Sequence, residues 1–150
     1  MTEIIELTIL IAEDDDGHAE LIQEGLRHSG VHNPIIRFSD GEEVSNFFSG
    51  KGEFSPEDNV DAYQPSKAYL LLLDIKMPRM DGVEVLRIMK SDPKLKEIPV
   101  IMLTTTDDPR EIKHCYALGC NLYITKPVEF QKFSNILKRL GLFIQIVKVC

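Results

Sequence analysis

The sequence lacks the features that mark several large classes of protein. It contains no run of lysine or arginine, and acidic residues outnumber basic ones 24 to 17, giving a formal net charge of -7. A nucleic-acid backbone would find no basic surface here, so direct nucleic-acid binding is not expected. No apolar stretch approaches the roughly 18 residues of a membrane span, and the first residues include acids where a secretory signal has basic residues. We therefore expect a cytoplasmic protein that does not enter the membrane.

Cysteine, glycine and histidine patterns exclude further kinds of site. The three cysteines are odd in number and lack the spacing of a metal site, so we expect reduced thiols. No Gly-x-Gly-x-x-Gly motif follows the first apolar segment, which argues against a dinucleotide-binding enzyme. The four histidines show no catalytic pattern, and each can be a surface group: His18, His28, His32 and His114.

The chain does contain a regular alternation of strand-like and helix-like segments. Apolar runs predict strands at residues 7–12, 35–38, 68–74, 98–103 and 122–125, and amphipathic segments predict helices at about 17–28, 41–48, 82–91, 109–118 and from 127 to about 140. Such an alternation is typical of an α/β fold with a parallel sheet covered by helices on both faces. The length of 150 residues predicts one domain, with a core at about residues 5–140.

Acidic residues stand where helix N-caps are expected. Asp40 and Asp81 each precede a predicted helix, with a glutamate three residues further on, which is the pattern of a capping box. Asp15 or Asp16 can cap the first helix in the same way. Pro109 occupies a predicted first helical position, where its missing N–H has no intrahelical partner to lose.

Two segments do not fit the alternation. Residues 49–67 are rich in Gly, Pro, Ser and acids, and are long for a connection within a compact domain, which indicates a functional loop or a mobile insertion. Residues 141–150 are apolar and β-branched, so we expect a strand-like arm that either folds back on its own chain or crosses to a second subunit. An exposed apolar edge favours association, and we expect a homodimer held partly by this arm.

Polar and charged side chains follow the ends of four predicted strands. They are Glu13, Asp14, Asp74, Thr104 and Lys126. Taken singly, each has an ordinary explanation as a loop acid, a strand threonine or a surface lysine. Taken together they form one group, because the carboxyl ends of parallel strands meet at one edge of the sheet, where ligands bind in open α/β folds.

The chemistry of this group favours phosphoryl transfer. Carboxylates within about 5 Å repel by roughly 3 kcal/mol per pair at an effective dielectric near 20, so a cation is expected among them. Mg²⁺ prefers hard oxygen ligands and is commonly held by one or two carboxylates and a phosphate. Lys126 and the Thr104 hydroxyl would contact phosphoryl oxygens. Asp74 would be the nucleophile, giving an aspartyl phosphate without a general base, while the phosphohistidine belongs to a partner.

These residues resemble the receiver domain of two-component response regulators, the CheY-like superfamily, over about positions 5–140. The segments that carry the resemblance are 9–15, 71–74 with 77–82, 99–105 and 123–127. The resemblance implies that Asp74 is the phosphoacceptor, that Thr104 and Tyr123 are switch residues, and that Lys126 is the active-site lysine. It also implies a magnesium site formed by Glu13, Asp14, Asp74 and the main-chain carbonyl of Lys76.

The resemblance further implies a flavodoxin-like strand order 2-1-3-4-5 and a cis peptide before Pro127. The insertion at 49–67 and the ending Leu140-Gly141-Leu142-Phe143 are most similar to single-domain receivers that partner phytochrome-type histidine kinases. We therefore expect a stand-alone response regulator, not an enzyme that turns over a substrate. Movement of Thr104 toward the phosphoryl group and rotation of Tyr123 would alter contacts with a downstream protein that the sequence does not identify.

Two alternatives stay open at this stage. A degenerate receiver could act as a phosphorylation-independent scaffold, although the complete set of site residues argues against this. A phosphatase of the haloacid-dehalogenase type also uses an aspartyl phosphate and magnesium. That family needs a second acid two residues after the nucleophile, where this chain has Lys76.

Overall fold

The structure is a computed structural model and describes residues 3–4, 7–50, 62–126, 129, 131–132, 135 and 148–149. Its central element is a five-stranded parallel sheet with the order β3-β2-β4-β5-β6. The strands are β2 (Leu7–Ala12), β3 (Ile35–Phe38), β4 (Ala68–Leu73), β5 (Val100–Thr104) and β6 (Leu122–Thr125). Numbered within the sheet alone, this is the order 2-1-3-4-5, so the predicted flavodoxin-like fold is confirmed.

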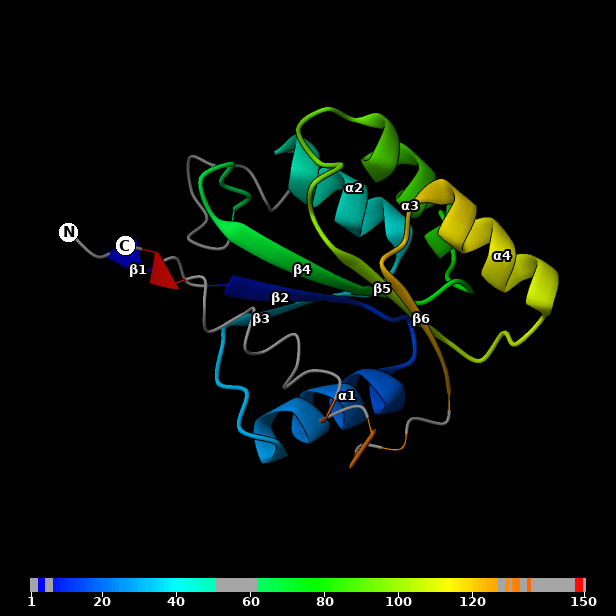
Figure 1. Cartoon of the computed structure of the whole chain (residues 1–150), viewed down its shortest axis with the longest axis horizontal. Helices are drawn as coiled ribbons and strands as arrows, with labels where there is room; N and C mark the ends of the chain where they lie inside the picture. The colour runs from blue at the N-terminus through cyan, green and yellow to red at the C-terminus, as the bar shows by residue number, and fades with distance from the viewer. Residues whose placement is uncertain are drawn as a thin grey trace.

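Helices cover both faces of the sheet (Figure 1). They are α1 (Asp16–His28), α2 (Gly41–Ser49), α3 (Gly82–Ser91) and α4 (Pro109–Leu118). Figure 1 shows α2, α3 and α4 on one face and α1 on the other. The alternation of side chains along β2 divides the core between them. Leu10 packs in the cluster with Val44 and Leu86, whereas Ile9 packs with Ile22 and Leu26 of α1.

Each of these four helices begins after an aspartate whose side chain accepts a backbone N–H from the first turn. The caps are Asp15, Asp40, Asp81 and Asp108. The N-cap ambiguity at the first helix is resolved by Asp15, which accepts from the His18 N–H at 2.9 Å. At α2 the Glu43 carboxylate reaches back to the N–H of Ser39, one residue before the cap, and not to the N–H of Asp40 itself as in a standard capping box.

Strand β5 starts later than predicted. The apolar run predicted a strand at 98–103, but the strand is Val100–Thr104. Pro99 has no N–H to donate to a strand ladder, and the Ile98 N–H donates instead to the carbonyl of Leu95 in a turn. Thr104 is paired with Thr125 and therefore lies inside the strand. The predicted strand at 68–74 likewise ends one residue earlier, although the Asp74 N–H still donates to the Ala12 carbonyl.

The segments that broke the alternation are described in part. Gly50 caps the end of α2 in the left-handed conformation, with φ of 73°. Residues 51–61 lie outside the described part of the chain. Where the chain is described again, Tyr63 packs edge-on against Phe47 and Phe48, with ring centroids 5.9 and 5.2 Å away. The predicted last helix is described at only a few positions, and the predicted cis peptide before Pro127 lies outside the described residues.

Of the predicted C-terminal arm, residues 148–149 are described and form a strand, whereas residues 141–147 lie outside the described part of the chain. Strand β7 (Lys148–Val149) pairs antiparallel with β1 (Glu3–Ile4), in a small sheet separate from the central one. In Figure 1 this pair lies beyond the end of the sheet where β2 begins. Among the described helices, none is long and apolar enough to cross a membrane.

Candidate phosphoacceptor site

Three carboxylates meet where the two central strands end. Glu13 follows β2 directly, and Asp74 follows β4 directly. Together with Asp14 they offer one carboxylate oxygen each, and these oxygens all lie within 4.8 Å of one another. Glu13 is 1% exposed and Asp74 is 8% exposed, whereas Asp14 is exposed. Hard oxygen ligands of this kind, at this spacing, fit a divalent cation such as Mg²⁺.

Lys126 brings a positive charge to the carboxylates from the end of β6. Its backbone N–H donates to the Thr104 carbonyl at 2.7 Å, which continues the pairing of β5 and β6. Its Nζ forms a direct ion pair with Glu13 Oε1 and lies 3.7 Å from Asp74 Oδ2. Burial raises the pKa of the Glu13 carboxyl above its usual value, and the hydrogen bond from Lys126 works against that shift.

The Asp74 carboxylate is held by its own loop. Its Oδ1 accepts the Ile75 N–H at 2.8 Å, and this hydrogen bond is buried. The loop closes on itself when the Gly82 N–H donates to the Ile75 carbonyl at 2.8 Å. A Cβ at Gly82 would lie 2.0 Å from the Asp74 carbonyl oxygen, so only glycine allows this close approach. The orientation of Asp74 therefore depends on a glycine eight positions later in the sequence.

The two predicted switch residues are connected through the backbone of Thr106. Thr104 is fully buried, and its Oγ1 lies 3.5 Å from the Thr106 N–H, at the limit of a hydrogen bond. The Tyr123 hydroxyl donates to the Thr106 carbonyl at 2.5 Å. Burial raises the pKa of Tyr123 to about 12, so the hydroxyl remains a donor to higher pH than an ordinary tyrosine. A displacement of Thr104 therefore acts on the residue that holds the tyrosine ring.

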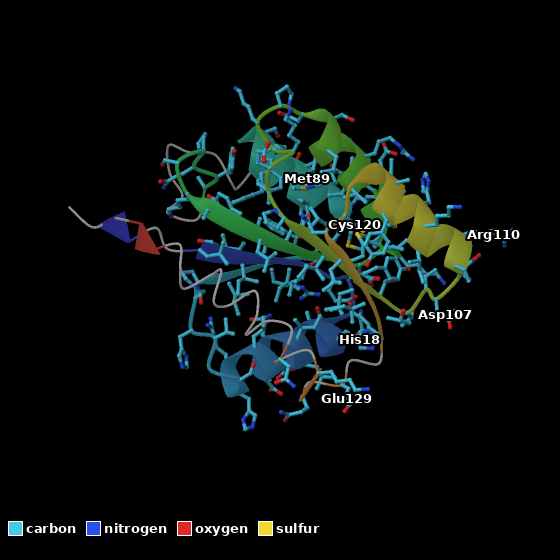
Figure 2. The ribbon with its side chains drawn as sticks, viewed as in Figure 1. His18, Met89, Asp107, Arg110, Cys120 and Glu129 are labelled. Atoms are coloured by element: carbon cyan, nitrogen blue, oxygen red, sulfur yellow. The ribbon has the colours of Figure 1, made fainter. Side chains whose placement is uncertain are left out.

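Some residues near the site were not recognised from the sequence. His18 is exposed, as predicted, but its closeness to the site was missed: its Nδ1 lies 3.4 Å from Lys126 Nζ and 3.8 Å from Glu13 Oε1. Figure 2 shows His18 at the N-terminal end of α1. The available signal was its position in the first turn of the helix that follows the acids. Arg37 of β3, which donates to the Glu13 carbonyl, was also missed, because it lies in a strand with no motif. Lys76 is exposed in the loop after Asp74.

The chain belongs to the response regulator receiver domain family, which matches residues 9–138. It is 37% identical over 120 residues to Response regulator Rcp1 of Synechocystis sp., covering 79% of this chain and 75% of that protein. It is also similar to the crystal structure of the phosphorylated cyanobacterial phytochrome response regulator RcpA, with 36% identity, a TM-score of 0.74, and 92% and 93% of the two chains covered.

A further similar solved structure holds a divalent cation. The Mn²⁺-bound form of response regulator Rcp1 is 31% identical to this chain, with a TM-score of 0.74 and 92% and 94% of the two chains covered. The chain is thus a response regulator of two-component systems. None of the matches described here supports the phosphatase alternative.

Proposed function

We propose that this protein is a magnesium-dependent phosphoacceptor that takes a phosphoryl group from a histidine kinase onto Asp74. The observation that carries the proposal is the convergence of Glu13, Asp14 and Asp74 within 4.8 Å, with the ammonium group of Lys126 3.7 Å from Asp74. Such a cluster combines a nucleophilic carboxylate with groups that hold positive charge beside it. Positioning and charge neutralisation supply most of the catalysis in phosphoryl transfer.

The two oxygens of Asp74 have different roles in this proposal. Oδ1 is occupied by the Ile75 N–H, whereas Oδ2 faces Lys126 Nζ from 3.7 Å, beyond hydrogen-bonding distance. Oδ2 is therefore the oxygen that attacks phosphorus. A new O–P bond forms while the N–P bond of the phosphohistidine breaks, and the electron pair of that bond stays on the imidazole nitrogen of the kinase. The nucleophile in this step is the carboxylate oxygen itself, so the step needs no general base.

Lys126 would stabilise the phosphoryl oxygens as charge develops. Its side chain is 8% exposed, so it acts in a site from which most water is excluded and where its interaction with an anion is strengthened. Glu13, Asp14, Asp74 and the main-chain carbonyl of Lys76 would hold the magnesium ion, which supplies positive charge next to the transferred group.

The source of the phosphoryl group is a sensor histidine kinase in this proposal, and we infer a phytochrome-type kinase. The support is the similarity to RcpA, a phytochrome response regulator, at 36% identity and with nearly full coverage of both chains. The solved bacteriophytochrome response regulator RtBRR, at 33% identity and a TM-score of 0.75, adds to it.

The output of phosphorylation would be a changed protein contact. A phosphoryl group on Asp74 offers the Thr104 hydroxyl an acceptor with nearly two negative charges. Movement of Thr104 would weaken its contact with the Thr106 N–H and disturb the Thr106 carbonyl that holds Tyr123. The surface formed by α4 and β6 would then differ between the two states, which is a shift between two populations.

We also infer a homodimer. The two-residue pairing of β1 with β7 is short enough to be exchanged between two chains, since the same hydrogen bonds form in either case. Light scattering on the full chain and on a chain ending at Leu140 tests this. Loss of the dimer on truncation supports the arm as its origin, and an undiminished dimer rules the arm out.

The central test is chemical labelling of the full chain with magnesium and acetyl phosphate, followed by intact mass. The native protein and the matched control Asp81→Asn should each gain one phosphoryl group, because Asn is as good an N-cap for α3 as Asp. Asp74→Asn should gain none. A native chain that is never labelled would favour the phosphorylation-independent scaffold.

A further inference from the structure

The segment that leads from β2 into the first residue of α1 carries four consecutive acids, residues 13–16, and contacts one arginine of the neighbouring strand. Arg37 donates twice to the main-chain carbonyl of Glu13, from Nε at 3.1 Å and from Nη2 at 2.7 Å. Its Nη1 donates to Asp16 Oδ1 at 2.7 Å. All three contacts lie on the segment that provides two of the proposed metal ligands.

The sheet brings Arg37 to this loop. Strand β3 pairs with β2 in a register that sets Arg37 opposite Ile11, and the Glu13 N–H donates to the Phe38 carbonyl at 3.0 Å. Arg37 therefore lies on the strand next to β2, level with the residues that come just before the acids. Its side chain is 24% exposed, so most of the side chain is packed against the protein.

The ion pair to Asp16 and the hydrogen bonds to the Glu13 carbonyl differ in how much they contribute. Asp16 is 92% exposed, and an ion pair to such a carboxylate contributes little. Glu13 is 1% exposed, and two donors on its carbonyl fix the plane of the peptide that joins it to Asp14. Because that plane stands between the two acids, its orientation sets how both carboxylates are presented to a cation.

We propose that Arg37 is a positioning residue that raises the affinity of the Glu13–Asp14 acid pair for a divalent cation. The inference rests on the proposed function, since it concerns the same metal site. Arg37 touches neither the cation nor the phosphoryl group; it acts through the main chain of a ligand. Removal of a residue that orients a metal ligand typically lowers the metal affinity about 10- to 100-fold.

The sign of the effect separates positioning from simple electrostatics. A guanidinium is always charged, and a fixed positive charge close to a cation site repels the cation. If Arg37 acted only as a charge, its removal would tighten magnesium binding. If it acts by holding the Glu13 carbonyl, its removal weakens magnesium binding.

The test is a calorimetric titration of the full chain with magnesium chloride at fixed ionic strength. Arg37→Gln should raise the dissociation constant about tenfold, within the range typical of lost ligand-orienting contacts. Arg37→Lys keeps the charge but cannot form the same fork, so it should also bind magnesium several-fold more weakly. Asp16→Asn should stay within about twofold of the native value, because it loses only an exposed ion pair.

Arg27→Gln is the matched control. Arg27 also donates to main-chain carbonyls, those of Val31 at 3.0 Å and Asn33 at 2.7 Å, but on the loop after α1. Its loss tests whether any arginine of this kind changes magnesium binding. An unchanged or tighter dissociation constant in Arg37→Gln, or one no weaker than in Arg27→Gln, overturns the proposal.

Labelling with acetyl phosphate gives a second readout. In Arg37→Gln the magnesium concentration for half-maximal labelling should rise, while the rate at saturating magnesium stays within about twofold, since Arg37 does not contact the reacting atoms. A lowered rate at saturating magnesium with unchanged half-saturation would contradict positioning of the metal ligands.

The failure of this inference can be distinguished from failure of the proposed function. A native chain that neither binds magnesium nor is labelled would overturn both the proposed function and the inference about Arg37. A native chain that binds magnesium with the same affinity as the Arg37 variants ends only the inference. If Arg37→Gln does not fold, as judged by circular dichroism, Arg37→Lys decides, and a native dissociation constant in that variant overturns the proposal.

Discussion

The side chain of Arg79 reaches from the loop after β4 to the start of α2, where it forms an ion pair with the carboxylate of Asp40. Two of its nitrogens, Nε and Nη2, lie 2.7 Å from Asp40 Oδ2. The other oxygen of Asp40 accepts the Glu43 N–H at 2.8 Å and caps α2. Asp40 is 1% exposed, so one buried carboxylate both starts a helix and anchors the loop that follows the phosphoacceptor.

Substitution of Asp40 should separate these two roles. Asp40→Ala removes the cap and the ion pair, and should lower the free energy of unfolding by about 1–2 kcal/mol. Asp40→Asn keeps a capping oxygen and should cost less. Urea unfolding of both variants measures the difference. Equal losses in the two variants would show that the capping hydrogen bond contributes nothing beyond the charge.

Much of the fold could be predicted because its signals are local. Apolar runs and capping aspartates are read from neighbouring residues, and parallel strands bring Glu13, Asp74 and Lys126 to one edge whatever their separation in sequence. The start of β5 was missed because an apolar run does not reveal that Pro99 cannot donate to the ladder. The contacts of Arg37 and Arg79 could not be predicted, since each depends on side-chain directions set by tertiary packing.

Gly82 gives a prediction about the rigidity of the phosphoacceptor loop. A Cβ there would lie 2.0 Å from the Asp74 carbonyl oxygen, and this is backbone, so the loop itself would have to shift. Gly82→Ala should destabilise the protein by about 1–3 kcal/mol, the usual cost of overpacking, and reduce labelling of Asp74. Thermal unfolding and intact mass measure the two effects.

Gly17→Ala is the control for Gly82→Ala. Both glycines lie in the first turn of a helix, but Gly82 is buried and Gly17 is exposed. A Cβ at Gly17 would meet only the exposed Asp15 Oδ1, at 3.2 Å. This oxygen also caps α1 by accepting the His18 N–H, so its shift of a few tenths of an ångström has a cost, which the higher helix propensity of alanine offsets. Gly17→Ala should therefore cost clearly less than Gly82→Ala, where backbone has to move. A loss in Gly17→Ala as large as in Gly82→Ala would mean that the effect is not specific to the loop.

Tyr123 gives a prediction about pH. Burial, with smaller effects of Cys115 and nearby acids, raises its pKa from 10.0 to about 12, so the folded state resists ionisation that the unfolded state undergoes. Its contribution to stability is complete below pH 10 and is lost as the pH rises toward 12. Absorbance titration of the native chain minus Tyr123→Phe isolates this group. A difference curve centred near pH 10 would contradict a partly buried hydroxyl that donates to Thr106.

The last prediction concerns the conflict between stability and function at the carboxylates. Glu13, Asp14 and Asp74 lie within 4.8 Å, and Lys126 offsets only part of their mutual repulsion. In the presence of a chelator, Asp74→Asn should therefore raise the free energy of unfolding by about 1–3 kcal/mol, a fraction of the pair repulsion expected at this distance. Magnesium should raise the melting temperature of the native chain more than that of Asp74→Asn, because a ligand stabilises the state that binds it.

Which of the two proteins, native or Asp74→Asn, has the higher melting temperature should thus depend on magnesium. Without magnesium, Asp74→Asn melts above the native chain; with saturating magnesium, the gap narrows or reverses. Asp81→Asn, which keeps the cap of α3 and lies outside the cluster, should follow the native chain in both conditions. A native chain more stable than Asp74→Asn in chelator would mean that Lys126 already neutralises the cluster. The drive to recruit a divalent cation would then have to come from the phosphoryl group and not from repulsion among the acids.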